Sequence, residues 1–204
     1  MAVQHHRLGF TSSYEVEVDP EFPASGGWGL TEIRVGGSSP ETIVIKVSPN
    51  KGEPWIGFFA CDERGLPVGV YACPHPEHLL VVTGLDAYLV SASQPHDFVE
   101  LPIHPITATA RPDGTDLIVV GSFTELAAID KVGLLWVTDR LFHDDLELVT
   151  GPPGKVYVQG SVGFLPRDPE LLTIDPATGK VVAGNWDPSL VVGERDRRWL
   201  REGK

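Results

Sequence analysis

The sequence predicts an all-β protein built as a meander of short strands. Apolar and polar residues alternate with a period of two in several segments, as in strands with one buried face. Other segments are short apolar runs rich in β-branched residues, which favour strands. Glycine and proline number 22 and 18 among 204 residues, above average usages of about 7% and about 5%. Turn residues at this density leave little room for long helices.

The strands can be placed in order along the chain. Residues 14–18 alternate, residues 41–47 form a β-branched run with partial alternation, and residues 155–159 alternate again. Residues 79–82 and 117–120 are continuous apolar runs, which are typical of strands buried on both faces. Turns rich in glycine and proline separate these segments at 36–40, 111–114, 151–154 and 175–179.

A short helix is predicted near the C-terminus, where Asp187 suits a helix cap and Pro188 suits the first helical position. Residues 123–128 fit a helical turn or a strand equally well. The tail from residue 191 holds five cations and three anions. We therefore expect a single all-β domain over residues 1–187, followed by a basic helical tail over residues 188–204.

One internal match indicates a repeat. The turn and strand at 74–82 match those at 112–120, a spacing of 38 residues, and weaker copies start at Pro40 and Pro153. A unit near 40 residues with three or four strands has the size of a propeller blade. Any meander of short strands also looks self-similar at such a spacing. The expected architecture is therefore either propeller-like, with repeats of roughly 38 residues, or a two-sheet sandwich.

Four motifs stand out in the second half of the chain: Phe-Thr at 123–124, Gly-Leu-Leu-Trp at 133–136, Arg-Leu-Phe-His-Asp-Asp-Leu at 140–146, and Asp-Pro-Ala-Thr-Gly at 175–179. Together with the strands around them, from residue 79 to 184, they resemble a group of bacterial β-rich proteins to which no activity is assigned. The resemblance covers about half of the chain. It implies propeller-like repeats and supplies no function.

The charge balance excludes two classes of partner. Lysine and arginine total 16 against 28 aspartates and glutamates, a formal charge of −12. Nucleic acids and anionic membranes attract cationic surfaces, so neither is an expected partner. A basic protein or a small ligand is the more natural one. The first ten residues lack the features of a signal peptide, so we expect a cytoplasmic protein with reduced cysteines.

Cys73, His75 and His78 form the densest group of potential metal ligands. Thiolate and imidazole are donors that zinc prefers. However, two prolines fix the local backbone, and a second pair of ligands at metal-binding spacing is missing. A polar turn beside a buried thiol therefore explains the segment better than a metal site, and no cofactor is expected.

His143 lies beside Asp144 and Asp145, and a carboxylate next to an imidazole can support general base catalysis. No nucleophile motif accompanies them, so we favour a turn in which the aspartates cap backbone amides. Trp28 and Trp55 lie in segments flanked by glycine and proline. Indoles exposed on such loops would suit ligand binding, although packing at the ends of a β core is the commoner role.

These observations favour a non-enzymatic function. The expected protein is an acidic β-scaffold that presents its loops to a protein or a ligand, for example an immunity-type or accessory protein acting against a basic partner. The alternative is a hydrolase that uses His143 with its aspartates, or a metal held by Cys73, His75 and His78.

Overall fold

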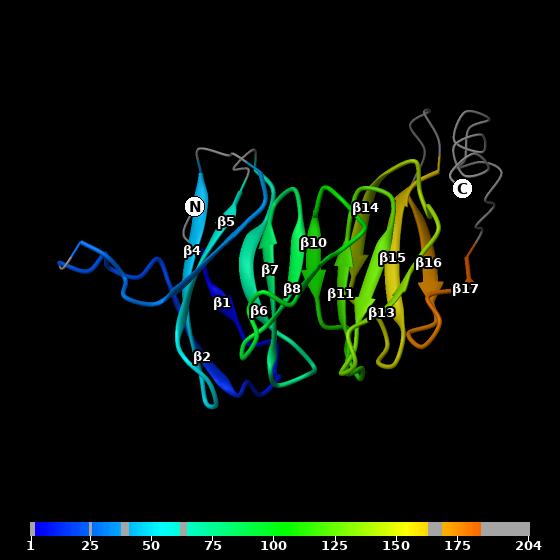
Figure 1. The fold of residues 1–204 in the computed structure, drawn as a ribbon. Helices are drawn as coiled ribbons and strands as arrows, with labels where there is room; N and C mark the ends of the chain where they lie inside the picture. Colours follow the sequence, from blue (N-terminus) through cyan, green and yellow to red (C-terminus); the bar gives the residue numbers. More distant parts are fainter. Residues whose placement is uncertain (1–2, 25, 38–40, 62–64, 163–168, 185–204) are drawn as a thin grey trace, which may run out of the picture. The chain divides into compact units, whose positions relative to one another are not determined.

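The computed structural model describes residues 3–24, 26–37, 41–61, 65–162 and 169–184 (Figure 1). These residues form an all-β protein of 17 strands in four small sheets, and they contain no helix. The predicted fold class is thus confirmed. The predicted C-terminal helix and the tail from residue 188 lie outside the described residues. Within the described part of the chain, no helix has the length and apolar content needed to cross a membrane.

The chain divides into two compact units, Met1–Ile106 with Ile129–Leu134, and Thr107–Ala128 with Leu135–Lys204. The first unit contains two sheets. One has the strand order β2-β4-β5-β3, and the other has the order β1-β6-β7-β8-β9. Their bounds are β1 (His5–His6), β2 (Tyr14–Val18), β3 (Thr31–Val35), β4 (Thr42–Pro49), β5 (Trp55–Ala60), β6 (Val68–Ala72), β7 (His78–Thr83), β8 (Ala87–Ser91) and β9 (Phe98–Glu100).

The core of the first unit draws on both of its sheets. Odd-numbered residues of β4, such as Ile43 and Ile45, are buried, and they share one hydrophobic cluster with Val81 and Tyr88 of the other sheet. Each fully buried side chain of this size contributes about 1.5–3 kcal/mol. Because side chains alternate along a strand, the even-numbered residues of β4 are left on the outer face of their sheet.

Two sheets of four strands follow, with the orders β10-β11-β12-β13 and β14-β15-β16-β17. Their bounds are β10 (Ala108–Ala110), β11 (Ile118–Gly121), β12 (Leu126–Ile129), β13 (Leu134–Val137), β14 (Asp144–Val149), β15 (Val156–Ser161), β16 (Glu170–Ile174) and β17 (Val181–Ala183). A second buried cluster joins Val119 and Trp136 to Val158 and Leu172. The ambiguous segment at 123–128 is a turn that leads into strand β12 and not a helix.

The two runs that suggested a repeat occupy similar places. The run at 79–82 lies in β7, which follows β6 and precedes β8. Residues 118–120 of the run at 117–120 lie in β11, which follows β10 and precedes β12. A polar side chain stabilises the hairpin turn after each strand. Thr83 Oγ1 accepts a hydrogen bond from the amide of Asp86, and Ser122 Oγ accepts one from the amide of Glu125. Whether these units repeat as propeller blades stays a prediction.

Candidate ligand-binding site

The first sheet forces one loop to cross its outer face. Strands β2 and β3 lie at opposite edges of the sheet, and both run parallel to β5. The chain between them, residues 19–30, must therefore travel across all four strands, about 15 Å, and back along their length. The inner face packs against the core. The connection therefore runs over the outer face, and we call it the crossover loop (Figure 1).

A row of four residues forms the floor beneath the crossover loop. Val44 pairs with Phe58 across β4 and β5, and Phe58 pairs with Arg34 across β5 and β3. Asp19 extends the row past the end of β2, where its amide donates a 2.8 Å hydrogen bond to the carbonyl of Val44. The row thus places a carboxylate at one edge, a guanidinium at the other, and two apolar side chains between them.

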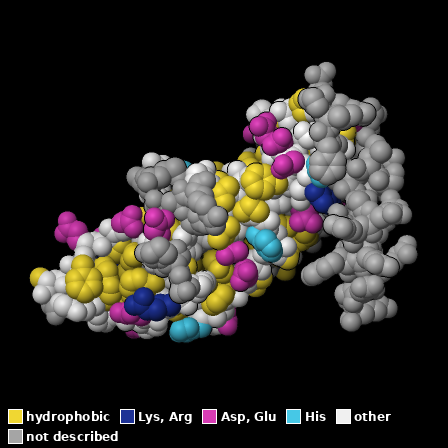
Figure 2. Space-filling model, turned by 90° about the horizontal axis from the view of Figure 1, so that it is seen from above, with side chains coloured by type: hydrophobic (Ala, Val, Ile, Leu, Met, Phe, Trp, Pro, Cys, Tyr) yellow, Lys and Arg dark blue, Asp and Glu magenta, His cyan; other side chains and the backbone are white. Residues whose placement is uncertain are grey.

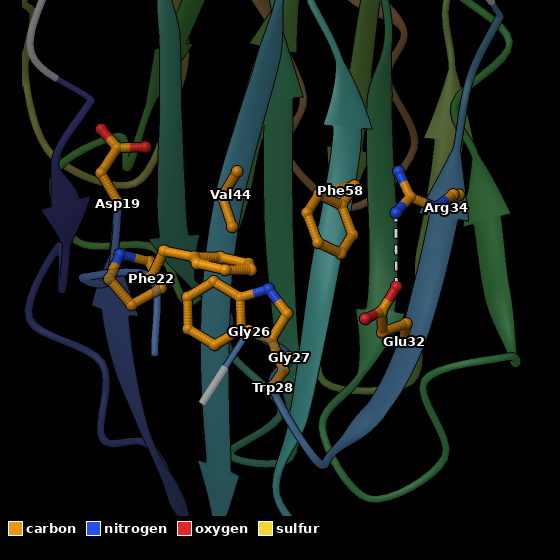
Figure 3. A pocket seen from close by; sticks show the side chains of 10 residues that line it. Asp19, Phe22, Gly26, Gly27, Trp28, Glu32, Arg34, Val44 and Phe58 are labelled. Atoms are coloured by element: carbon orange, nitrogen blue, oxygen red, sulfur yellow. Dashed lines mark hydrogen bonds and ion pairs between the residues drawn. The ribbon is translucent and has the colours of Figure 1, made fainter. Parts of the chain in front are cut away.

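The crossover loop supplies the other walls. Phe22 and Trp28 meet edge to face, with ring centroids 5.5 Å apart and planes at 84°. Together with the floor and the backbone of Gly26 and Gly27, they enclose a pocket of about 410 Å³ (Figure 3). Phe22 is 66% exposed and Trp28 is half-buried. The pocket therefore presents aromatic surface to solvent, which is the usual character of a small-ligand or side-chain site.

The indole of Trp28 differs from those of the other described tryptophans. Trp55 Nε1 donates to the carbonyl of Ala92 at 2.8 Å, and Trp136 Nε1 donates to that of Pro176 at 2.8 Å. No described residue accepts a hydrogen bond from Trp28 Nε1. Tryptophan N–H groups usually find a partner when they are buried. Trp28 therefore keeps both an aromatic face and a polar donor available at the pocket.

Arg34 already makes a cation–π contact inside this pocket. Its guanidinium carbon lies 4.2 Å from the centroid of the Phe58 ring. One guanidinium nitrogen lies 3.3 Å from a carboxylate oxygen of Glu32, and the Arg34 side chain is 70% exposed (Figure 3). An ion pair this exposed contributes about 0–1 kcal/mol, and a cation–π contact at an exposed site about 0.5–1 kcal/mol.

Carboxylates outnumber cations around the pocket. On the outer face of the sheet, Arg34 pairs with Glu32, and Lys46 pairs with Glu17 at 3.3 Å. Three further carboxylates on β2 and the crossover loop form no ion pair with any described residue; they belong to Glu15, Asp19 and Glu21. Figure 2 shows the same imbalance, with several acidic side chains on the viewed face and few basic ones. The pocket therefore lies in a negative field.

Trp55, the other tryptophan suggested as a binding residue, occupies a different environment. It is 1% exposed, it belongs to the core of the first unit, and its indole N–H is satisfied by Ala92. Trp55 is therefore not an exposed binding residue, and its placement is the commoner of the two roles expected for such an indole, packing in the β core. Trp55 begins strand β5, which is an inner strand of its sheet, and its side chain turns inward.

The structure does not assemble a metal site from Cys73, His75 and His78. No group of three or more histidine, cysteine, aspartate or glutamate side chains in the described part of the chain is placed to hold a metal ion. Cys73 is buried and points its thiol toward the carbonyl of Tyr71 at 3.9 Å. Burial raises the pKa of this thiol well above its ordinary value, which disfavours the thiolate that a metal needs.

The two histidines of this turn contact each other. The rings of His75 and His78 lie 4.4 Å apart between centroids, and His75 Nδ1 accepts a hydrogen bond from the amide of Glu77. His78 Nδ1 is buried and forms no hydrogen bond with any described residue. Burial lowers the pKa of His78, and the neighbouring His75 lowers it further, against an opposite effect of Glu77. The segment is thus a turn in which the two histidine rings pack against each other.

The His143 segment is held by backbone contacts. Arg140 donates to the carbonyls of Phe142 and His143 at 3.1 and 2.9 Å, and the amide of His143 donates to the carbonyl of Ser161. Asp144 Oδ1 accepts a hydrogen bond from the amide of Asp145, which has a left-handed φ of 57°. These contacts are those expected for a turn. A catalytic role for His143, Asp144 and Asp145 stays a prediction.

Sequence reasoning singled out Trp28 but missed the rest of the pocket. The missed residues are Asp19, Phe22, Glu32, Arg34, Val44 and Phe58. One signal was present in the sequence. Val44 is an apolar residue on the face of β4 opposite to the buried Ile43 and Ile45, and apolar residues at such positions indicate a covering segment or a ligand. What covers them depends on the strand order, which no local pattern reveals.

No protein-family model matches the sequence, and no curated protein matches it. Among solved structures, the chain is similar to apo AztD from Citrobacter koseri, with 16% identity over 76% of this chain and 46% of that one and a TM-score of 0.41. It is also similar to the N-terminal domain of Nup159, with 13% identity over 90% of this chain and 53% of that one and a TM-score of 0.38. The chain thus spans about half the length of these two structures.

Proposed function

We propose that this chain is a non-catalytic binding module and that the pocket beneath the crossover loop is where it takes its ligand. The observation that carries the proposal is the state of Trp28. Its indole is half-buried over an apolar floor, and no described residue accepts a hydrogen bond from its N–H, whereas the indoles of Trp55 and Trp136 are satisfied by carbonyls. A ligand that covers the ring and accepts this hydrogen bond would complete the site.

The position of the pocket supports a binding role. The floor residues stand on a sheet whose opposite face is packed into the core, so they are held rigidly. The walls come from a loop, and loops on a rigid scaffold commonly carry binding residues. The chain as a whole is acidic, with a formal charge of −12, which favours basic or neutral partners over anionic ones.

The test is a binding survey that compares the wild type with W28A. Basic peptides, neutral apolar peptides and neutral oligosaccharides are titrated separately into both ¹⁵N-labelled proteins. The affinities are taken from backbone amide signals, which both proteins have, and the indole N–H signal of Trp28, assigned with W28F, is followed in the wild type. We expect saturable binding of at least one class, weakened at least tenfold in W28A. The control V132A truncates another exposed apolar side chain, 81% exposed, on the turn between β12 and β13. It should bind like the wild type. No saturable binding, or equal binding by W28A, would refute the proposal.

A further inference from the structure

We infer that the pocket beneath the crossover loop recognises a guanidinium or alkylammonium group, such as an arginine or lysine side chain of a basic polypeptide. The inference rests on the binding function proposed above and names its ligand class. It depends on one internal contact: Arg34 already lies in this pocket as such a group would.

Arg34 shows how the pocket accommodates a cation. Its guanidinium stacks over Phe58 at 4.2 Å and pairs with the Glu32 carboxylate at 3.3 Å. The pocket lining contains a second aromatic ring and a second carboxylate, Trp28 on the crossover loop and Asp19 at the other end of the floor. Arg34 occupies one of these pairs, and no ion pair with a described residue occupies the carboxylate of Asp19.

The negative charge around Asp19 and the indole ring of Trp28 both favour a cation in this part of the pocket. Tryptophan binds cations over its face more strongly than the other aromatic side chains. Glu15 on β2 and Glu21 on the crossover loop add carboxylates that form no ion pair with any described residue. A long basic side chain can also lay its methylene groups on Val44 and Phe22 while its charged end stays partly hydrated. The negative field of the pocket would repel an anionic ligand.

Replacing Arg34 with alanine distinguishes a cationic ligand from a sugar or an anion. If the ligand is cationic, Arg34 adds like charge to the pocket and holds Phe58 and Glu32, which a second basic group of the ligand would otherwise contact, so R34A should bind more tightly. If the ligand is a sugar or an anion, Arg34 is a hydrogen-bond donor to it, and R34A should bind more weakly. The sign of the change therefore identifies the ligand chemistry.

The probe is a blocked pentapeptide with two arginines, titrated into ¹⁵N-labelled full-length protein beside a peptide with citrulline in their place. Citrulline keeps the shape of arginine without its charge. We expect the arginine peptide to bind at least fivefold more tightly than the citrulline peptide, and its affinity to fall as salt rises from 50 to 500 mM. R34A should bind the arginine peptide about two- to fivefold more tightly, the equivalent of one exposed cation–π contact.

Two control variants, K131A and E53Q, make the same changes in charge as R34A and D19N at other positions. K131A removes one positive charge from the turn between β12 and β13, and it should change the affinity less than R34A does. D19N should weaken binding about twofold to fourfold, as the loss of an exposed ion pair does. E53Q removes a carboxylate from the turn at the far end of β4 from Val44, so it should have a smaller effect than D19N. Unchanged melting temperatures confirm that all variants are folded.

The outcomes separate the two proposals. Equal binding of the arginine and citrulline peptides, or weaker binding by R34A, overturns the cationic ligand. If an oligosaccharide or a neutral peptide binds in a manner that depends on Trp28 while the arginine peptide does not, the binding function stands and the ligand class is wrong. If nothing binds in that manner, both proposals fail.

Discussion

Replacing Trp55 with phenylalanine tests whether the two tryptophans of the first unit have different roles. Trp55 is 1% exposed, and its indole donates to the Ala92 carbonyl at 2.8 Å. The smaller ring loses about 1 kcal/mol of transfer free energy, and the residual cavity adds up to about 1 kcal/mol. The buried carbonyl left without its donor costs about 1–3 kcal/mol. We therefore expect W55F to lower the free energy of unfolding by about 3 kcal/mol.

W28F is the matched control, because it makes the same chemical change at a half-buried ring with no described hydrogen-bond acceptor. It should cost less than about 1 kcal/mol, as substitutions outside a packed core generally do. The assay is urea unfolding followed by circular dichroism near 218 nm, because fluorescence would itself change with the tryptophan content. A W55F cost below about 1 kcal/mol, or equal costs for the two variants, would refute this assignment of roles.

Three further predictions concern glycine, histidine and cysteine. G179A should lower the free energy of unfolding, measured in urea, by about 2–3 kcal/mol. The reason is that φ at this position is +70° and the new Cβ would lie 2.8 Å from Trp136 Cδ2. A decrease below about 0.5 kcal/mol would contradict this packing. The pKa of His78 lies below its ordinary 6.5, chiefly through burial, so the unfolded chain binds the proton more readily and stability is lost as the pH falls below 6.5. H78Q should therefore flatten the fall in the urea midpoint between about pH 7.5 and pH 5, relative to the wild type. Burial also raises the pKa of Cys73, so a thiol reagent should label it at pH 8 only after unfolding, and rapid labelling of native protein would show that the site opens.

Local patterns predicted the strands well. The alternation at residues 14–18 and 155–159 reports which face of a strand is buried, and this information is local. Both segments are strands in the structure, as β2 and β15. The continuous apolar runs at 79–82 and 117–120 likewise lie in strands whose residues are buried throughout or nearly so.

The pocket was largely beyond prediction from the sequence, because it depends on strand order. Trp28 and Trp55 have similar glycine- and proline-containing neighbours, yet one lies on the crossover loop and the other begins an inner strand. Asp19, Phe58 and Arg34 share a row only because β4 and β5 separate β2 from β3. No periodic pattern in the sequence indicates that β4 and β5 lie between β2 and β3 in the sheet. Around Cys73, the two prolines and the missing second pair of ligands favoured a polar turn over a metal site, and in the structure Cys73 is buried beside such a turn.

The crossover loop separates the residues that form the pocket walls from the residues that form the core along the sequence. Its twelve residues could reach about 40 Å when extended, well beyond the roughly 22 Å diagonal that joins the two edge strands, so the loop has slack. Lengthening such a loop is thermodynamically inexpensive, about 0.6 kcal/mol for a doubling, whereas the alternating core beneath it tolerates little change. Substitutions at positions 20–30 would therefore reshape the walls of the pocket while sparing the sheet, so the crossover loop is a suitable place for randomised libraries.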